Sequence, residues 1–162
     1  MDRLSPAARN LHMGRVRRAN TKPEWIVRRL LHQLGYRFRV QWKGAPGRPD
    51  VAFPGKRKII FIHGCFWHQH EGCRLAHIPR TRRGFWEAKF KRNRQRDARD
   101  LSQAQEEGWE TLVVWECETN EPMALEATLR DFLGAVKRSP TKQGGGSESP
   151  SFPPSRSKIP DS

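Results

Sequence analysis

The segment KIIFIHGCFWHQH, residues 58–70, joins an unbroken apolar run to a cluster of cysteine and histidine side chains. A short apolar run bounded by turn residues is typical of a central strand. Residues 51–53, followed by the turn at 54–56, predict a partner strand in a hairpin. We therefore expect the second strand of this hairpin to lead directly into a loop that carries chemistry.

Two further elements are predicted before the hairpin. A capping-box spacing from Thr21 to Glu24 opens a helix that Gly35 closes. Apolar and polar residues then alternate over 36–42, which is typical of a half-buried strand. The core face of the helix is expected to consist of Trp25, Ile26, Leu30, Leu31 and Leu34.

Three elements are predicted after the cysteine and histidine loop. Residues 85–107 indicate a helix with a sparse apolar seam, residues 109–115 a strand, and residues 125–136 a last helix. The order helix, strand, strand, strand, helix, strand, helix indicates an α/β fold. The core stripe of the last helix is expected to consist of Leu125, Leu129, Phe132 and Val136.

The chain of 162 residues fits one domain, which we place at residues 21–137. Residues 1–20 are rich in Arg and lack apolar periodicity, which predicts a basic arm that orders on a partner. Residues 138–162 are dominated by Ser, Pro, Gly and Lys, which predicts a disordered tail.

The charge of the chain narrows its partners. With 31 Lys and Arg against 17 Asp and Glu, the formal net charge is +14, and nine of the cations lie in residues 80–100. A field of this strength attracts a polyanion without regard to its sequence, and nucleic acid is the leading candidate. No secretory signal and no apolar run of bilayer length is present, so we expect a cytoplasmic protein that does not bind membranes.

All three cysteines belong to one metal-ligand pattern, in which Cys65, His70 and Cys73 are close in sequence and Cys117 is distant. Three cysteines cannot pair completely as disulfides, and a nearby histidine favours zinc in a reducing compartment. Four protein ligands close the coordination shell, which predicts a structural ion that ties the loop to Cys117. The alternative is that Cys117 is an ordinary buried cysteine.

His68 and His70 are two residues apart, so in an extended loop their side chains point to opposite sides. One of them can bind zinc while the other is available for acid–base chemistry. We favour His70 as the ligand, and the opposite assignment stays open.

A carboxylate and a second histidine are predicted at neighbouring strand ends. Asp50 precedes the first strand of the hairpin, and His63 follows Ile62 at the end of the second. Hydrolysis of a phosphodiester needs Mg²⁺ on oxygen ligands and a group that accepts a proton from water. Asp50 and the backbone carbonyl of Ile62 offer the oxygens, and His63 and His68 are candidates for the proton, whereas Glu24 also has the structural role of a cap.

Taken together, these residues resemble the very-short-patch repair (Vsr) family of DNA mismatch endonucleases. The resemblance covers about two thirds of the chain, and its Gly-Cys-Phe-Trp-His core is highly specific. The matching motifs are Thr21-x-Pro23-Glu24, Gly47-Arg48-Pro49-Asp50, Phe61-x-His63-Gly64-Cys65-Phe66-Trp67-His68, Phe85-Trp86 with Lys89, Asn93 and Arg96-Asp97, Gly108-Trp109, and Trp115-Glu116-Cys117.

The resemblance implies a fold like that of type II restriction endonucleases, a mixed sheet flanked by helices, with structural zinc and catalytic Mg²⁺. It implies an enzyme that nicks one strand of duplex DNA 5′ of the thymine in a T:G mismatch, the lesion left by deamination of 5-methylcytosine. It further implies a monomeric bacterial protein of the cytoplasm, associated with the nucleoid when bound to DNA. Contacts with mismatch-repair proteins stay open.

The resemblance also assigns roles to individual residues. The catalytic set is Asp50, His63, His68 and Glu24, with His68 favoured as general base. Mg²⁺ is held by Asp50 and the carbonyl of Ile62, and zinc by Cys65, His70, Cys73 and Cys117. The side chains that intercalate are Phe66, Trp67, Trp86 and Met13, and those that contact DNA phosphate are Arg15, Arg48, Lys89, Asn93 and Arg96.

Two other functions fit parts of the pattern. A zinc-stapled module that recognises distorted DNA without cutting it would use the same charge and aromatics, but has no need of Asp50, His63 and His68. A nuclease that cuts matched DNA would need all of them. Trp86 also has a plain structural reading, because it shares a helical face with Phe90.

Overall fold

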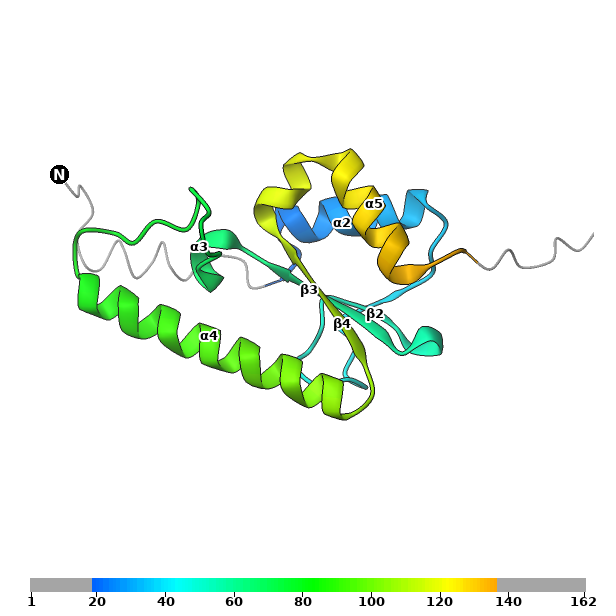
Figure 1. The fold of residues 1–162 in the computed structure, drawn as a ribbon, viewed down its shortest axis with the longest axis horizontal. Coiled ribbons are helices and arrows are strands. Elements are labelled where there is room, and N and C mark those ends of the chain that lie inside the picture. Colours follow the sequence, from blue (N-terminus) through cyan, green and yellow to red (C-terminus); the bar gives the residue numbers. More distant parts are fainter. Residues whose placement is uncertain (1–18, 137–162) are drawn as a thin grey trace, which may run out of the picture.

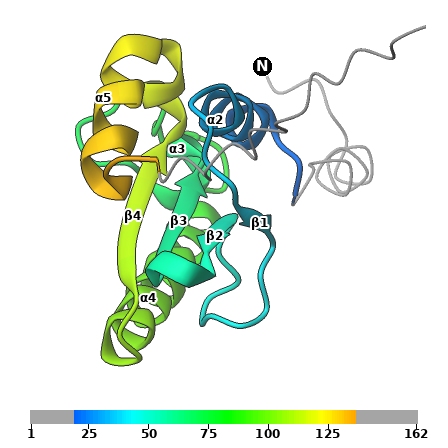
Figure 2. The same ribbon diagram turned by 90° about the vertical axis from the view of Figure 1, so that its right-hand side faces the viewer.

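A mixed sheet of four strands lies at the centre of residues 19–136, the part of the chain that the computed structural model describes (Figure 1). The strand order is β1-β2-β3-β4, with antiparallel pairing among the first three strands and parallel pairing of β3 with β4. Helices α2 and α5 cover one face and α4 the other, which gives three layers (Figure 1, Figure 2). The predicted α/β class, a mixed sheet flanked by helices, is confirmed. The elements are α2 (Lys22–Gln33), β1 (Arg39–Val40), β2 (Val51–Phe53), η1 (Pro54–Lys56), β3 (Lys58–His63), α3 (Cys65–His68), α4 (Arg83–Glu106), β4 (Glu110–Trp115), η2 (Glu116–Asn120) and α5 (Pro122–Leu133).

The hairpin of β2 and β3 is buried on both faces, as its apolar run predicts. Ile60 and Ile62 pack in one cluster with residues of α2 and α5, whereas Ile59 and Phe61 pack in a second cluster with α4. Successive strand residues point to opposite faces, so a continuous apolar run serves both clusters. The end of β3 therefore lies between two packed layers, which fixes the start of the loop that follows.

Helix α2 confirms the predicted element but corrects its buried face. Val27 and Leu31 are fully buried, while Trp25 is 59% exposed. Glu24 and Arg28 are buried beside them and form an ion pair at the spacing i, i+4. The four buried residues together follow the spacing i, i+3, i+4, i+7 of one helical face. Val27 and Leu31 pack with the sheet in one core cluster, and the ion pair shares their face, so the buried face includes two charged positions that an apolar pattern does not predict.

The predicted capping box of α2 is wrong in its hydrogen bonding. The hydroxyl of Thr21 donates to Glu24 Oε1 at 2.9 Å and does not cap the helix. The second carboxylate oxygen accepts the backbone N–H of Asn20 at 2.9 Å. Because the Thr21 hydroxyl is bonded to the Glu24 carboxylate, it does not accept a backbone N–H of the first helical turn, as a capping side chain would.

The predicted strand at 36–42 is shorter than expected. Only Arg39–Val40 pair with β2, and Val40 is 50% exposed. Gln41 has a φ of 47°, and this left-handed conformation ends the extended backbone. Tyr36 is buried, Phe38 packs against the first core cluster and Trp42 against the second, so Val40 is the one member of the predicted apolar face that is exposed.

Helix α5 packs on the sheet through Leu125, Leu129 and Leu133 in place of the predicted stripe that continued to Phe132 and Val136. The helix ends at Leu133, and the last two expected residues only flank the core. Within residues 19–136, no helix combines the length and apolar character needed to cross a membrane. The predicted tail, and the arm apart from its last two residues, lie outside the described residues, as do Met13 and Arg15.

Candidate metal centre and active site

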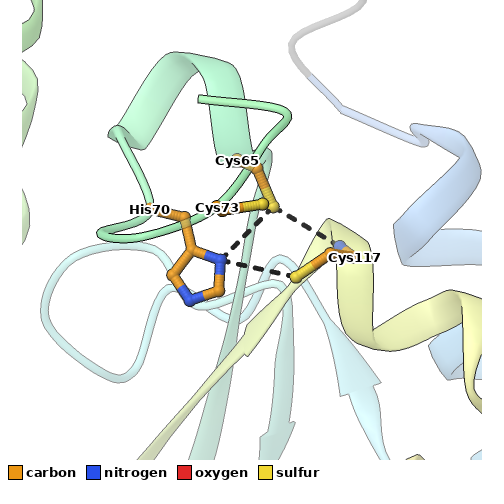
Figure 3. A group of neighbouring side chains, drawn as sticks. All are labelled: Cys65, His70, Cys73 and Cys117. Atoms are coloured by element: carbon orange, nitrogen blue, oxygen red, sulfur yellow. Dashed lines mark hydrogen bonds between the residues drawn. The ribbon is translucent and has the colours of Figure 1, made fainter. Parts of the chain in front are cut away.

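Four donor atoms, from Cys65, His70, Cys73 and Cys117, lie within 4.8 Å of one another (Figure 3). His70 Nδ1 is 3.7 Å from Cys65 Sγ and 3.4 Å from Cys117 Sγ. In a tetrahedral zinc site these edges measure roughly 3.5 Å, given zinc–sulfur and zinc–nitrogen bonds of about 2.3 and 2.0 Å. The cluster therefore has the donor types and spacing of a closed metal site.

Parallel pairing of β3 with β4 brings the distant cysteine to this cluster. His63 is aligned with Trp115, so Cys65 and Cys117 each follow their strand by two residues and meet at the same edge. The backbone N–H of Cys117 donates to Cys65 Sγ at 3.4 Å. An ion held here would tie two adjacent strand ends together.

The thiols differ in their readiness to ionise in the metal-free protein. Burial raises the pKa of Cys65 to about 12 and also raises the pKa of Cys117. The backbone N–H of Leu75 lowers the pKa of Cys73. A soft divalent ion stabilises thiolates and would displace the protons of the first two thiols, so the donor set fits such a metal.

A second cluster combines His63, His68 and Asp97. His68 Nδ1 and Asp97 Oδ2 are 2.5 Å apart, and the rings of His63 and His68 are stacked with centroids 4.0 Å apart and an interplanar angle of 7°. Stacked rings cannot both direct an in-plane nitrogen lone pair to one ion. The arrangement is therefore suited to proton transfer more than to metal binding.

The local backbone, and not an extended loop, separates His68 from His70. Residues 65–68 form the helical turn α3, and Gln69 follows with a left-handed φ of 49°. His68 faces Asp97 of α4, whereas His70 turns to the cysteines. The two side chains face different clusters, as expected, but a helical turn and a left-handed residue separate them in place of an extended loop.

Burial and neighbouring groups together set the protonation of the second cluster. Burial and the neighbouring His68 lower the pKa of His63 to about 4. Burial acts to raise the pKa of Asp97, but the hydrogen bond with His68 and the surrounding positive charges outweigh it and leave that pKa below its ordinary value. At neutral pH the cluster thus contains a neutral His63 and an ionised Asp97 beside His68.

Asp50 is anchored to the strand that carries His63. Its Oδ2 accepts the backbone N–H of Ile62 at 2.7 Å. Burial is the largest influence on Asp50 and raises its pKa to about 6, with a further increase from Glu24 and a decrease from Arg28. The structure therefore brings Asp50 to the end of β3, next to the predicted carbonyl ligand.

The burial of Asp50 predicts a stability change in Asp50→Asn. In the unfolded chain the carboxyl has its ordinary pKa of 3.8, so above pH 6 the ionised form is disfavoured only in the folded protein. Asparagine keeps an acceptor for Ile62 and removes this cost. Without added Mg²⁺, the variant should be more stable than the parent at pH 8 by up to about 3 kcal/mol. The gain should vanish as the pH falls below 4, where the Asp50 carboxyl is protonated in both the folded and the unfolded state. Thermal melting at pH 8 and below pH 4 measures the difference. A variant less stable than the parent at pH 8 would contradict the cost of burying the ionised carboxylate.

The aromatic side chains predicted to intercalate into DNA, here called the wedge, form one cluster. The ring of Phe66 lies 5.0 Å from Trp67, 5.6 Å from Trp86 and 5.2 Å from Phe90. Trp86 is 9% exposed, so in this structure it is a buried residue, as its shared helical face with Phe90 suggests. Its intercalation into DNA stays a prediction. Lys89 Nζ lies 4.9 Å from the centre of a Trp67 ring, which places a cation beside the wedge.

The predicted phosphate contacts have different surroundings. Arg48 is exposed, and the side chain of Arg96 is 52% exposed and 3.6 Å from Asp97. Asn93 Nδ2, in contrast, donates to the backbone carbonyl of Trp67 at 2.9 Å. Its amide thus anchors α3 in the DNA-free structure, a role the sequence did not predict.

Two residues of the site had no predicted role. Asp97 appeared in a motif, but nothing in the sequence pairs it with a histidine 29 residues away. Arg28 lies four residues after Glu24 and donates to its Oε2 at 2.9 Å. The i, i+4 spacing was the available signal, but it is common on exposed helices.

Comparison with known proteins places these features in a family. Residues 1–74 match the model of the family described as DNA mismatch endonuclease Vsr. The chain is 50% identical over 132 residues to the type II nicking enzyme V.XorIIP of Xanthomonas oryzae pv. oryzae, a match that covers 82% of this chain and 96% of the relative. It is 45% identical over 111 residues to the DNA mismatch endonuclease Vsr of Escherichia coli, covering 68% and 70%. It is 32% identical over 136 residues to the type II nicking enzyme V.NmeAIP of Neisseria meningitidis serogroup A, covering 84% and 96%. Because these matches extend over most of each relative, the chain belongs to the Vsr family of DNA mismatch endonucleases.

Proposed function

We propose that this protein is a Mg²⁺-dependent endonuclease that nicks one strand of duplex DNA 5′ of the thymine in a T:G mismatch. Such mismatches arise by deamination of 5-methylcytosine, and the nick starts very-short-patch repair. The observation that carries the proposal is the His68–Asp97 contact beside His63, near the end of the strand that anchors Asp50. A protein that only binds DNA has no use for this acid–base set. The similarity to nicking enzymes and to a Vsr endonuclease supports the same activity.

Asp50 and the backbone carbonyl of Ile62 are the proposed ligands of Mg²⁺. Carboxylate and carbonyl oxygens are the hard ligands that Mg²⁺ takes, usually with water and substrate phosphate completing the shell. When bound, the ion would stabilise charge that develops on the scissile phosphate. The hydrogen bond from Ile62 N–H fixes the orientation of the Asp50 carboxylate for this role.

His68 is the proposed general base. Asp97 accepts a hydrogen bond from Nδ1–H of His68, so Nε2 keeps the lone pair with which it takes a proton from the attacking water. Asp97 also stabilises the imidazolium that forms. His63, neutral and stacked on His68, holds the ring in place and can donate one hydrogen bond to developing charge.

His68→Ala should lower the nicking rate by roughly 10²–10⁴-fold, which is the usual contribution of a general base. The zinc content measured by mass spectrometry should not change, because His68 is outside the cysteine cluster. His32→Ala is the matched control, since His32 is an exposed histidine on α2 outside both clusters. If His68→Ala lost zinc, the residue would be a ligand and not the base.

Zinc is the proposed ion at Cys65, His70, Cys73 and Cys117. Three thiolates and one imidazole favour a soft ion, and a shell of four protein ligands has no position for a reactive water. The ion would therefore hold α3 and the end of β4 in place for the active site and take no part in hydrolysis.

Recognition of the mismatch is proposed to use Phe66, Trp67 and Trp86, with Met13 entering from the arm. A mismatched pair is poorly stacked, so inserting aromatic rings costs less there than in matched DNA. The proposed phosphate contacts give affinity without sequence preference. The residues of these phosphate contacts are Arg15, Arg48, Lys89, Asn93 and Arg96.

We further propose that the protein acts as a monomer in the bacterial cytoplasm.

A nicking assay over a panel of T:G duplexes with different flanking bases, beside the matched homoduplex, tests this function. The proposal expects Mg²⁺-dependent cleavage of one strand in at least one T:G context and none in the homoduplex. Equal cleavage of matched DNA would support a nuclease without mismatch specificity. Binding without cleavage in any divalent ion would support a recognition module.

A further inference from the structure

Arg28 carries a buried charge beside the active site that the proposed chemistry does not use. Its side chain is 9% exposed, and that of its partner Glu24 is 4% exposed. Nη2 donates to Glu24 Oε2 at 2.9 Å and Nη1 donates to Asn20 Oδ1 at 2.7 Å. Burying such a pair is expensive and is often no more stabilising than an apolar pair of similar size.

Arg28 is not optimised for stability. Its Nε is buried and has no hydrogen-bond partner among residues 19–136. An unpaired buried donor costs on the order of 1–3 kcal/mol. The fold therefore tolerates a penalty at this position, and the reason for it is found in the neighbouring carboxylates.

Glu24 has little capacity left for a metal. Its two oxygens accept three hydrogen bonds, from the hydroxyl of Thr21, the backbone N–H of Asn20 and the guanidinium of Arg28. A carboxylate held by these donors is kept from turning toward an ion. Asp50 thus stays the one carboxylate of the proposed site that has a metal-binding role.

The charges of the three residues act on one another. Glu24 and Arg28 both lie on the buried face of α2, beside Val27 and Leu31. These two apolar residues pack in one core cluster with Val51 and Ile62, so the pair is held against the strands that adjoin Asp50 and carry the proposed carbonyl ligand. Two carboxylates and one guanidinium leave a net charge of −1 around the proposed Mg²⁺ position. Without the guanidinium it would be −2, which would hold a divalent cation more tightly.

We propose that Arg28 is a positioning residue that holds Glu24 out of the metal shell, so that Mg²⁺ binds firmly only when a DNA phosphate completes the site. The inference rests on the proposed Mg²⁺-dependent nicking. It assigns the buried ion pair a role in setting metal affinity, which a purely structural pair would not have.

Four proteins with three values of the site charge provide the test. Mg²⁺ binding to the DNA-free, zinc-loaded protein is measured by calorimetry, and Mn²⁺ binding by electron paramagnetic resonance. Arg28→Met changes the charge to −2, Glu24→Gln changes it to 0, and the double variant returns it to −1. Arg29→Met is the matched control, because Arg29 is the exposed neighbour on the same helix.

Arg28→Met should bind Mg²⁺ about tenfold more tightly than the parent, and Glu24→Gln about tenfold more weakly, for one charge at a partly buried site. The double variant and Arg29→Met should match the parent. In nicking assays Arg28→Met should reach half-maximal rate at lower Mg²⁺ but turn over more slowly, and Arg28→Lys should restore the parent Mg²⁺ dependence. If Arg28 had only a structural role, Arg28→Met would need more Mg²⁺ to reach half-maximal rate and would also turn over more slowly.

The double variant keeps the test decisive if Arg28→Met does not fold, since it removes both buried charges together. The inference would be supported if the double variant bound Mg²⁺ as tightly as the parent while Glu24→Gln bound it more weakly. A folded Arg28→Met with unchanged or weaker Mg²⁺ binding would overturn it, as would a double variant no tighter than Glu24→Gln. A parent protein that fails to nick with Mg²⁺ would instead refute the proposed function.

Discussion

Asp50→Asn is expected to reduce Mg²⁺-dependent nicking of a T:G duplex by on the order of 10³-fold or more, because a catalytic metal contributes several kcal/mol to the transition state. The substitution removes the anionic ligand but keeps an oxygen that accepts the N–H of Ile62. The local fold should therefore persist. Single-turnover nicking with excess enzyme measures the loss at the chemical step.

DNA binding provides the control for this variant. Affinity for the T:G duplex, measured by fluorescence anisotropy at fixed salt, should stay within a few-fold of the parent value, because phosphate contacts dominate affinity. Asp100→Asn is a matched control, since Asp100 is a carboxylate on α4 outside both clusters. Undiminished nicking by Asp50→Asn would remove this residue from the metal site.

Cys117→Ser is expected to abolish cooperative folding at 25 °C. Structural zinc contributes about 10–16 kcal/mol in small zinc domains, as much as the entire stability of many domains. Cys117 is the one proposed ligand that comes from the end of β4, and the other three lie in the segment after β3. Circular dichroism melting and zinc content read out the effect.

Chelation of the parent protein is the control for this second prediction. A strong chelator should abolish the cooperative melting transition of the parent, as the substitution does, and should have no effect on Cys117→Ser. The variant should also fail to retain zinc in stoichiometric amount. A Cys117→Ser protein that melts at the parent temperature would show that the cluster does not hold the fold together.

The sequence predicted the fold best where one physical signal acted alone. The apolar run at 58–62 gave β3 and its hairpin, and the parallel partner strand delivered Cys117 beside Cys65. Prediction was poorer where two signals competed. The buried pair of Glu24 and Arg28 rotated the face of α2, and the left-handed backbone at Gln41 shortened β1.

The candidate site was predictable to the extent that its residues are local or chemically distinctive. Three cysteines with one histidine define a metal pattern at any distance, because soft ligands are rare and have few other roles. The partner of His68 was not predictable, because Asp97 comes from another helix and carboxylates are common along that helix. The hydrogen bond from Asn93 to Trp67 was also hidden, since an amide beside basic residues fits a phosphate contact equally well.

The most direct measurement is the position of the nick. Zinc-loaded protein is incubated with Mg²⁺ and a duplex that contains one T:G mismatch, with each strand end-labelled in turn. We expect a single cut immediately 5′ of the mismatched thymine, on that strand alone and only with the divalent ion present. Intact strands under these conditions, or cuts in both strands at positions unrelated to the mismatch, would contradict it.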